Sequence, residues 1–375
     1  MRKKILLLNT SFRFEGPNDV LWQLARCNDN SRFELIFGCM HEGGPMEELY
    51  RQAGFRTHNF GMSTLLDLGV SRRVRDFVQT EKIDLAMAQL LRAEVFGGYG
   101  VRLAGRPLIL VIQNNDPYRA KWWHLPHHPL SQMAIKWPLK VVAVSAGVKE
   151  FILEHQGVAE ERVVTIHDAI DPGHFAGLAN ERDQVRAEFA LSPHQVVIGT
   201  VARLAPQKGL PNLLQAFTSI ARNFRQARLL IVGEGPERKR LEAIIREAGL
   251  QDSVILAGFR RDYDRILQGF DIFALPSLWE GLPMSLMAAM ASGKAAVASA
   301  VAGIPELIRD GDSGMLVPPG DISSLVVKIE TLLKDEPLRL RLGNKAREYI
   351  TANCSASVMA ANYHRLWDES LGGKP

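Results

Sequence analysis

The sequence predicts an α/β protein with two doubly wound, Rossmann-like domains that face each other across a cleft. Short apolar runs alternate with amphipathic stretches along most of the chain, and a turn-rich segment near residue 170 interrupts this alternation. Buried strands that alternate with helices form parallel sheets covered on both faces. The chain has 375 residues, of which 46% are hydrophobic, and this length suits two domains better than one.

The first domain is predicted to span residues 1–170. Its strand candidates are 4–8, 33–38, 85–88, 108–113, 141–144 and 163–166, and amphipathic stretches lie at 20–27, 46–53 and 72–80. The segment 168–175, which begins Asp168-Ala-Ile-Asp171, is turn-rich and aperiodic. We therefore interpret it as the linker between the domains.

The second domain is predicted to span residues 171–350. Its strand candidates are 196–201, 227–232, 254–257, 272–275, 295–298 and 315–317, and its helix candidates are 211–224, 237–247, 283–292 and 322–334. Such sheets bind ligands at the carboxyl ends of their strands. The cleft between two such domains is therefore the expected site.

Composition narrows the classes of function and compartment. The net charge is +4, and no arginine-rich arm or zinc-finger spacing is present, which argues against nucleic acid as a partner. The three cysteines, Cys27, Cys39 and Cys354, are too few and too scattered for a disulfide framework. No run of about 18 apolar residues predicts a membrane span. We expect a cytoplasmic protein, with peripheral contact at the inner face of the membrane left open.

Two loops in the second half carry groups that suit a diphosphate. Arg203 follows a predicted strand and Lys208 lies in the loop after it, so that the two could clamp phosphate oxygens; solvated loop charges are the alternative. Glu280 follows another strand, and the next residues, Gly281, Leu282, Pro283, Met284 and Ser285, lead into a helix. Backbone N–H groups at such a helix start favour an anion, while the carboxylate suits sugar hydroxyls. Glu280 could instead cap the helix.

A glycine pair, Gly233-Glu-Gly235, lies between a predicted strand and a helix. It partly matches a dinucleotide fingerprint, but Arg238 stands where the third glycine would be. A structural turn is the more common role of such a pair. A nicotinamide-dependent dehydrogenase is therefore a third and weaker hypothesis.

Taken in order, these motifs resemble the second domain of the retaining family 4 glycosyltransferases, which have the GT-B fold. The resemblance rests on Arg203 with Lys208-Gly209, Gly233-Glu-Gly235-Pro236, Gly258-Phe259, Glu280-Gly281-Leu282-Pro283, Gly303-Ile-Pro305-Glu306 and Gly311-Asp-Ser-Gly314. It covers about residues 165–350 and is looser in the first half. In that fold the final helix, here 351–375, packs back onto the first domain; a helix that caps only the second domain is the alternative.

The resemblance implies a donor that is a UDP-sugar or a GDP-sugar, no metal for the chemistry and no other cofactor. Arg203 and Lys208 would hold the diphosphate, and Glu280 with residues 281–285 would hold sugar and phosphate. The loop of Gly233 would lie close by, and Phe259 and Arg260 would lie at the base. Gly16, which remains of a glycine pair after the first strand, would face the donor. The acceptor would be a glycan or a lipid-linked sugar.

Three positions depart from the family pattern. Ala288 stands where a second glutamate normally follows Glu280, and its absence removes a charge-assisted hydrogen bond of about 1.5–3 kcal/mol. Gln113-Asn114-Asn-Asp116 stands where a histidine is common, and only Gly16 remains of the glycine pair. A degenerate member that serves as a binding or scaffolding subunit is therefore the alternative to an active enzyme.

The acceptor side is predicted at the segment after residue 113, which combines aromatic and basic groups. The candidate residues are Asn114, Asp116, Trp122, Trp123 and His124. Tryptophan with lysine suits a lipid–water interface, and aromatic rings also stack on sugars. The alternative is a large loop whose tryptophans pack into the domain, and a metal site is not expected from its proline-interrupted histidines.

Overall fold

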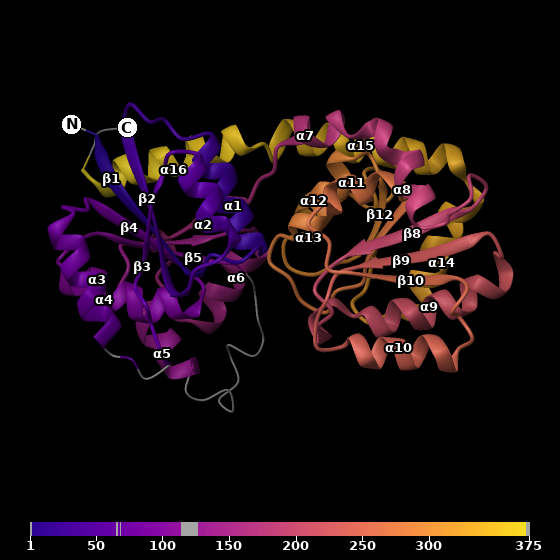
Figure 1. Ribbon diagram of the computed structural model, residues 1–375, viewed down its shortest axis with the longest axis horizontal. Helices are drawn as coiled ribbons and strands as arrows, with labels where there is room; N and C mark the ends of the chain where they lie inside the picture. Colours follow the sequence, from indigo (N-terminus) through magenta and orange to yellow (C-terminus); the bar gives the residue numbers. More distant parts are fainter. Residues whose placement is uncertain (1, 65–66, 68, 114–126, 373–375) are drawn as a thin grey trace. The chain divides into compact units, whose positions relative to one another are not determined.

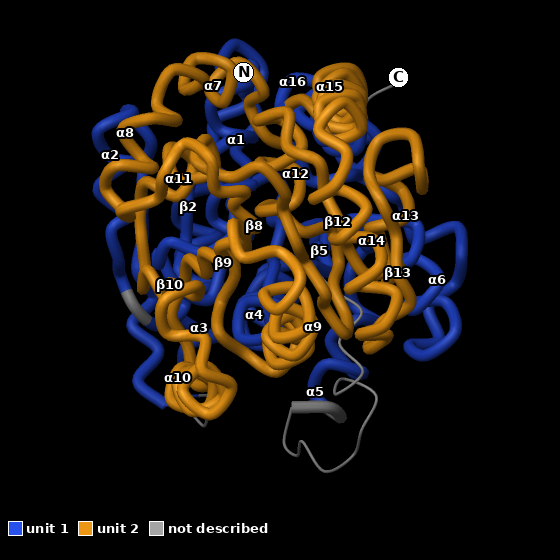
Figure 2. Tube along the Cα trace, turned by 90° about the vertical axis from the view of Figure 1, so that its right-hand side faces the viewer, with its two compact units in different colours: residues 1–169, 356–375 blue, residues 170–355 orange. Residues whose placement is uncertain are grey.

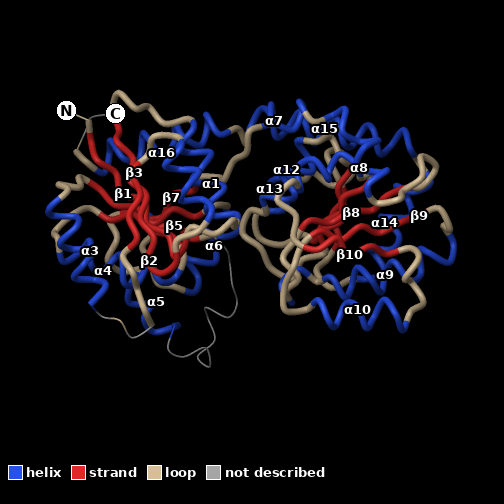
Figure 3. Tube along the Cα trace, in the orientation of Figure 1, coloured by secondary structure: helices blue, strands red, loops and turns tan. Residues whose placement is uncertain are grey.

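The computed structural model describes residues 2–64, 67, 69–113 and 127–372. The chain divides into two compact units, one formed by Met1–Ala169 with Ala356–Pro375 and the other by Ile170–Ser355 (Figure 2). Each unit has a central parallel sheet with helices on both faces (Figure 3). The predicted α/β class with two Rossmann-like units is confirmed.

Unit 1 contains a seven-stranded sheet in the order β3-β2-β1-β4-β5-β6-β7. Every pair of neighbouring strands is parallel. The strands are β1 (Lys3–Ser11), β2 (Phe33–Glu42), β3 (Arg56–Asn59), β4 (Leu85–Gln89), β5 (Leu108–Ile112), β6 (Lys140–Ala143) and β7 (Val163–Thr165). The sequence missed β3 because its residues are polar and half-exposed, so that they show no apolar run.

The helices of unit 1 lie on both faces of this sheet (Figure 1). They are α1 (Gly16–Arg26), α2 (Pro45–Gln52), α3 (Gly69–Thr80), a π-helical turn η1 (Ala93–Gly97), α4 (Gly98–Leu103), α5 (His127–Ala134), α6 (Ala146–His155) and α16 (Ala356–Ser370), with a 3₁₀ turn η4 at Glu160–Arg162. Helix α16 packs against the start of β2, where Phe33 stacks on His364 and meets Trp367 edge-on.

Unit 2 contains a six-stranded sheet in the order β10-β9-β8-β11-β12-β13. Its strands are β8 (Val196–Val201), β9 (Ala227–Val232), β10 (Val254–Gly258), β11 (Ile272–Leu275), β12 (Ala295–Ser299) and β13 (Met315–Val317). All six were predicted from their apolar runs. Leucine, isoleucine and valine from the strands and from α9, α10 and α14 form one buried core on one face of this sheet.

The helices of unit 2 lie in two layers, with α9, α10 and α14 on one face and α8, α11 and α12 on the other (Figure 1). Their bounds are α7 (Pro172–Gly177), α8 (Arg182–Glu188), α9 (Leu210–Asn223), α10 (Arg238–Glu247), α11 (Tyr263–Ile266), α12 (Met284–Ala291), α13 (Ile304–Leu307), α14 (Ile322–Lys334) and α15 (Glu336–Asn353). Three 3₁₀ turns are η5 (Ala179–Glu181), η6 (Pro206–Lys208) and η7 (Leu267–Gly269).

Helix α7 corrects the expectation of an aperiodic linker at 168–175. The Asp171 carboxylate accepts a hydrogen bond from the backbone N–H of Gly173 (3.0 Å), and Pro172 occupies the first helical position. Both are helix-start signals, but a helix of six residues is too short to show periodicity. The expected terminal helix also differs: α15 runs to Asn353, and α16 begins three residues later.

Candidate functional site

The 3₁₀ turn η6, which follows β8, is fastened to the loop that follows β11. The backbone carbonyl of Gln207 accepts from the N–H of Leu278 (2.8 Å), and its side-chain amide donates to the carbonyl of Trp279 (2.9 Å). Gly209 has φ = +60°, and a Cβ there would lie 2.1 Å from the carbonyl oxygen of Pro276. Only glycine fits this contact, so the two loops form one rigid element at the carboxyl edge of the sheet.

This element brings Lys208 and Glu280 together. The Lys208 ammonium lies 2.6 Å from Glu280 Oε1, and the Ser277 hydroxyl donates to the same oxygen at 2.6 Å. The side chains of Lys208 and Glu280 are only 16% and 5% exposed. A carboxylate buried this deeply requires a charged partner. Lys208 keeps two further N–H donors, and neither of these two bonds uses Glu280 Oε2.

The start of α12 offers unused backbone donors beside Glu280. Within the described part of the chain, the N–H groups of Leu282, Met284 and Ser285 donate no hydrogen bond. The sequence predicted Pro283 as the first residue of this helix, but in the structure Pro283 is the cap residue that precedes it. Met284 and Ser285 are half-exposed. Free donors at a positive helix end attract an anion.

Arg203 lies on the segment between β8 and η6, and its side chain is exposed. It forms no ion pair or side-chain hydrogen bond with any residue that the structure describes. Cβ atoms at Gly233 and Gly235 would lie 1.9 Å from the carbonyl oxygen of Ala202 and 2.4 Å from that of Leu204. The glycine pair therefore supports the backbone on either side of Arg203.

The packing of Gly233 and Gly235 shows which backbone the partial dinucleotide fingerprint accommodates. The glycines allow close approach, as the sequence suggested, but the backbone that approaches is the chain's own segment at Ala202 and Leu204. Leu204 donates to the carbonyl of Glu234 (2.9 Å), and Gly233 donates to that of Gly258 (2.8 Å). The turn thus connects the Arg203 segment to the end of β10.

At the end of β10 the two candidate base contacts differ. Phe259 is 56% exposed. Arg260 is already engaged, because its guanidinium pairs with Glu188 (2.5 Å) and Asp262 (2.7 Å). The hydrogen bonds from Arg260 hold the pKa of Asp262 down at about 2. The Phe259 side chain is therefore accessible to a ligand, whereas the Arg260 side chain is held in an ion-pair network.

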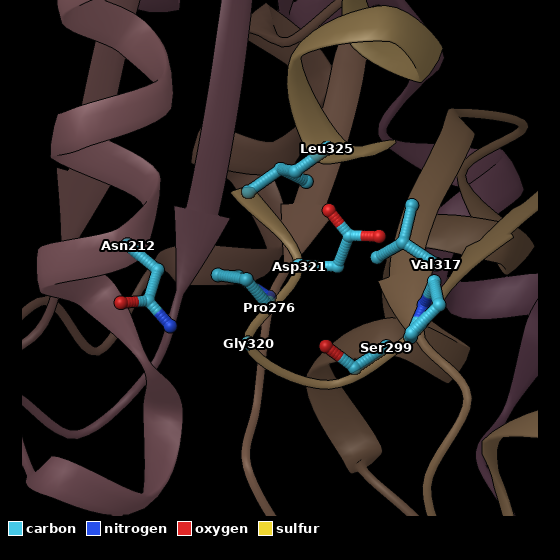
Figure 4. Close-up of a pocket in the computed structure, with 8 residues that line it drawn as sticks. Asn212, Pro276, Ser299, Val317, Gly320, Asp321 and Leu325 are labelled. Carbon is cyan, nitrogen blue, oxygen red and sulfur yellow. The ribbon is translucent and has the colours of Figure 1, made fainter. Parts of the chain in front are cut away.

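A narrow hollow opens near the same edge of the sheet (Figure 4). Pro276, Ser299 and Val317, which follow or end β11, β12 and β13, line it together with Asn212 and Asp321. Its interior has essentially no space for a water-sized sphere, whereas ligand pockets usually measure about 300–1,000 Å³. It is therefore too small to be the site of a nucleotide.

The carboxyl edge of unit 1 carries a chain of neutral amides, of which the sequence pointed only to Gln113. Gln113 donates to Gln89 Oε1 (3.0 Å), and Gln89 donates to the backbone carbonyl of Pro17 (2.9 Å). Asn9 donates to Asn18 Oδ1 (2.6 Å). Gln89 ends β4, Gln113 follows β5 and Asn9 lies two residues before the end of β1, and this placement was the signal available in the sequence.

Asp19 adds a carboxyl group to this edge. It lies in the first turn of α1, where Gly16 is the first residue. Burial raises the pKa of the Asp19 carboxyl to about 7. It forms no ion pair or side-chain hydrogen bond with any described residue. A carboxyl group with a near-neutral pKa at this position was not predicted, because burial of a first-turn aspartate depends on its tertiary neighbours.

The remaining predicted residues are placed as follows. Ala288 is completely buried on α12. The acceptor candidates Asn114, Asp116, Trp122, Trp123 and His124 lie outside the described residues. In the ranges that are described, no three histidine, cysteine, aspartate or glutamate side chains are grouped to hold a metal. No helix there is long and apolar enough to span a bilayer.

Two Rossmann-like units in one chain are the architecture of the GT-B class of proteins. Two family descriptions match the chain and together span most of it. "Glycosyltransferase Family 4" matches residues 15–174, and "Glycosyl transferases group 1" matches residues 181–349. The chain belongs to glycosyltransferase family 4.

Curated relatives and solved structures agree with this family. The chain is 24% identical over 325 residues to the UDP-Gal:alpha-D-GlcNAc-diphosphoundecaprenol alpha-1,3-galactosyltransferase of Escherichia coli, covering 84% of each chain. It is 26% identical over 250 residues to the 2-deoxystreptamine glucosyltransferase of Streptomyces kanamyceticus, covering 64% of this chain and 65% of that enzyme. The match thus spans less than two thirds of the latter's length.

Anabaena Alr3699/HepE, solved in complex with UDP-glucose, has the same fold. Its TM-score is 0.84 at 22% identity, and the superposition covers 98% of this chain and 99% of that one. At this identity the likeness establishes the fold and does not identify the ligand of this chain.

Proposed function

We propose that this protein transfers a sugar from a nucleoside diphosphate sugar to a glycan or lipid-linked acceptor, with retention of anomeric configuration. The donor is a UDP-sugar or a GDP-sugar, the sugar is a hexose, and the chemistry needs no metal. The acceptor lies at the inner face of a membrane, in the synthesis of a cell-surface polysaccharide or glycolipid. UDP-glucose bound to HepE and the lipid-linked acceptor named for the E. coli relative support this choice of substrates.

One observation carries the proposal: unit 2 gathers unused positive groups at one carboxyl edge. The unpaired guanidinium of Arg203, the spare N–H donors of Lys208 and the free backbone donors at the start of α12 belong to loops tied to one another. A diphosphate is the common metabolite group that such a set complements. Glu280, held by Lys208, would present its second oxygen to a sugar hydroxyl.

The proposed step balances without a further reactant. The bond between the anomeric carbon and the diphosphate oxygen breaks, and its electron pair goes to that oxygen. The acceptor hydroxyl oxygen forms the new bond on the same face of the sugar, and its proton passes to the departing diphosphate. Arg203, Lys208 and the α12 donors would stabilise the charge that grows on the leaving group.

Calorimetric titration of the full chain with UDP, GDP and ADP tests the donor site. We expect micromolar binding of one nucleotide. Arg203→Ala should weaken it about 10- to 150-fold, because a charge-assisted hydrogen bond is lost. Arg246→Ala, which removes an exposed arginine from α10, is the matched control and should bind as the wild type does. If none of the three nucleotides binds at millimolar concentration, the proposal is wrong.

The alternative of a degenerate binding subunit rests on Ala288. This side chain has no exposed surface, so a glutamate introduced there would have to displace its neighbours on α12. Ala288→Glu is therefore best compared with the isosteric Ala288→Gln. Tighter nucleotide binding by Ala288→Glu, but not by Ala288→Gln, would indicate that the native site is weakened.

Retention of configuration needs a separate test. An NMR spectrum of the product's anomeric proton would show whether configuration is retained.

A further inference from the structure

Unit 1 carries a cluster of exposed apolar side chains. Nine large hydrophobic residues are exposed in the part of the chain that the structure describes, and four of them fall between residues 99 and 139. They are Tyr99 (44% exposed), Leu103 (43%), Met133 (46%) and Leu139 (47%). The other five, Phe259, Leu278, Val327, Leu340 and Val358, do not cluster in this way along the chain.

The four side chains belong to one surface, which we call the α4–α5 patch. Tyr99 and Leu103 are four residues apart on α4 and therefore share a helix face. The ring of Tyr99 lies 5.4 Å from that of Trp137, which follows α5. The N–H of Leu139 donates to the carbonyl of Leu108 at the start of β5 (2.8 Å), close in sequence to Leu103. Helix α5 itself, which carries Met133, contacts the π-helical turn before α4.

Basic side chains accompany this patch, and none of them pairs with a carboxylate in the described ranges. Arg102, Arg106 and Lys136 are exposed, and none forms an ion pair with a described residue. Residues 95–113 and 127–149 contain no aspartate or glutamate. On neighbouring elements Glu160 is paired with Lys149 (3.1 Å) and Asp76 with Arg75 (2.7 Å), whereas Glu161 pairs with no described cation.

We propose that the α4–α5 patch docks on the surface of an anionic lipid bilayer. Tyrosine and tryptophan prefer the lipid–water interface, leucine and methionine can enter the acyl boundary, and arginine and lysine bind anionic headgroups. A second copy of the chain is a poor occupant, because the same unpaired cations would face one another. The inference deepens the proposed function, since a lipid-linked acceptor would be met at the surface on which the patch docks.

Co-sedimentation with vesicles tests the docking. The full chain is mixed with vesicles of phosphatidylcholine alone and with vesicles that contain 30 mol% phosphatidylglycerol. We expect binding only to the second kind, and weaker binding as salt is added. Each basic residue near such a surface contributes about fivefold to partitioning, so Arg102→Gln/Arg106→Gln should weaken binding roughly 25-fold. Leu103→Ser/Leu139→Ser should weaken it about tenfold or more.

Matched controls come from unit 2. Lys239→Gln/Arg246→Gln removes two exposed cations from α10, and Val327→Ser/Leu340→Ser removes two exposed apolar side chains. Both should bind vesicles as the wild type does. Circular dichroism and nucleotide titration check that each variant is folded, and nucleotide binding without vesicle binding would reject the docking alone. The docking proposal would also be overturned if patch and control variants lost vesicle binding equally. A wild-type dimer that the patch substitutions dissociate would overturn it as well.

Discussion

The carboxyl edges of the two sheets have the same position in the fold and opposite chemistry. In unit 2 the edge carries the buried Lys208–Glu280 pair, the unpaired Arg203 and free helix-start donors. In unit 1 it carries the amides of Gln89 and Gln113, bonded to each other and to the backbone. Formal charge dominates the first edge, and neutral groups that both donate and accept dominate the second.

Because of this difference, the two edges suit ligands of different chemistry. Charged donors in a low-dielectric edge favour a ligand with several negative charges. Neutral amides match hydroxyl groups, which also donate and accept, and they do so without repelling a proton-bearing acceptor. Asp19 is the exception in unit 1, because burial raises the pKa of its carboxyl to about 7 and it can therefore be neutral or charged near physiological pH.

Breaking the Lys208–Glu280 pair of unit 2 should have the largest effect on the free energy of unfolding. Lys208→Met leaves Glu280, 5% exposed, with no cation, and a buried pair broken on one side typically costs about 3–5 kcal/mol. Urea unfolding of the full chain measures this loss. The double variant Lys208→Met/Glu280→Gln should recover much of the stability, and Lys239→Met, exposed on α10, should change little. A loss below about 1 kcal/mol in Lys208→Met would contradict the pairing.

Titrating the Asp19 carboxyl group of unit 1 should have an intermediate effect on the free energy of unfolding. Unfolded aspartate has a pKa of about 3.9, and the folded value of Asp19 is about 7. Between these values the folded chain holds the proton and the unfolded chain has lost it, so this contribution to stability falls as pH rises from about 4 to 7.

Asp19→Asn removes this titration. The variant should match the wild type near pH 4 and exceed its stability by up to about 4 kcal/mol at pH 8, because a pKa difference of about three units corresponds to that free energy. Thermal unfolding at both pH values measures the difference. Asp252→Asn, at an exposed position, serves as the control and should leave the pH dependence of the wild type unchanged. A constant offset between Asp19→Asn and the wild type would show that folding does not raise the pKa of the half-buried Asp19 carboxyl.

Breaking an amide pair of unit 1 should have the smallest effect. Gln113→Leu deprives Gln89 Oε1 of its donor, and a neutral hydrogen bond contributes about 1 kcal/mol. Gln79→Leu, exposed on α3, is the control. If Gln113→Leu destabilises unit 1 as strongly as Lys208→Met destabilises unit 2, the contrast between neutral and charged edges is wrong.

The strands of unit 2 and the starts of α9, α10, α12 and α14 were predictable because they follow from local patterns. Apolar runs between turn residues identified all six strands of unit 2, and Gly281-Leu282-Pro283 identified the start of α12 to within one residue. Helix α7 and strand β3 were missed since each is short and carries no periodic apolar signal. Local patterns therefore specify the layers but not every element.

The sequence by itself determined the class of fold, the family and the residue types at the edge of unit 2. Only the tertiary structure decided their partners. It pairs Lys208 with Glu280 across 72 positions, commits Arg260 to Glu188 and leaves Arg203 unpaired. The reason is physical: periodicity and turn chemistry act between neighbours in the chain, whereas burial and charge pairing depend on which distant segments the sheet brings to the same edge.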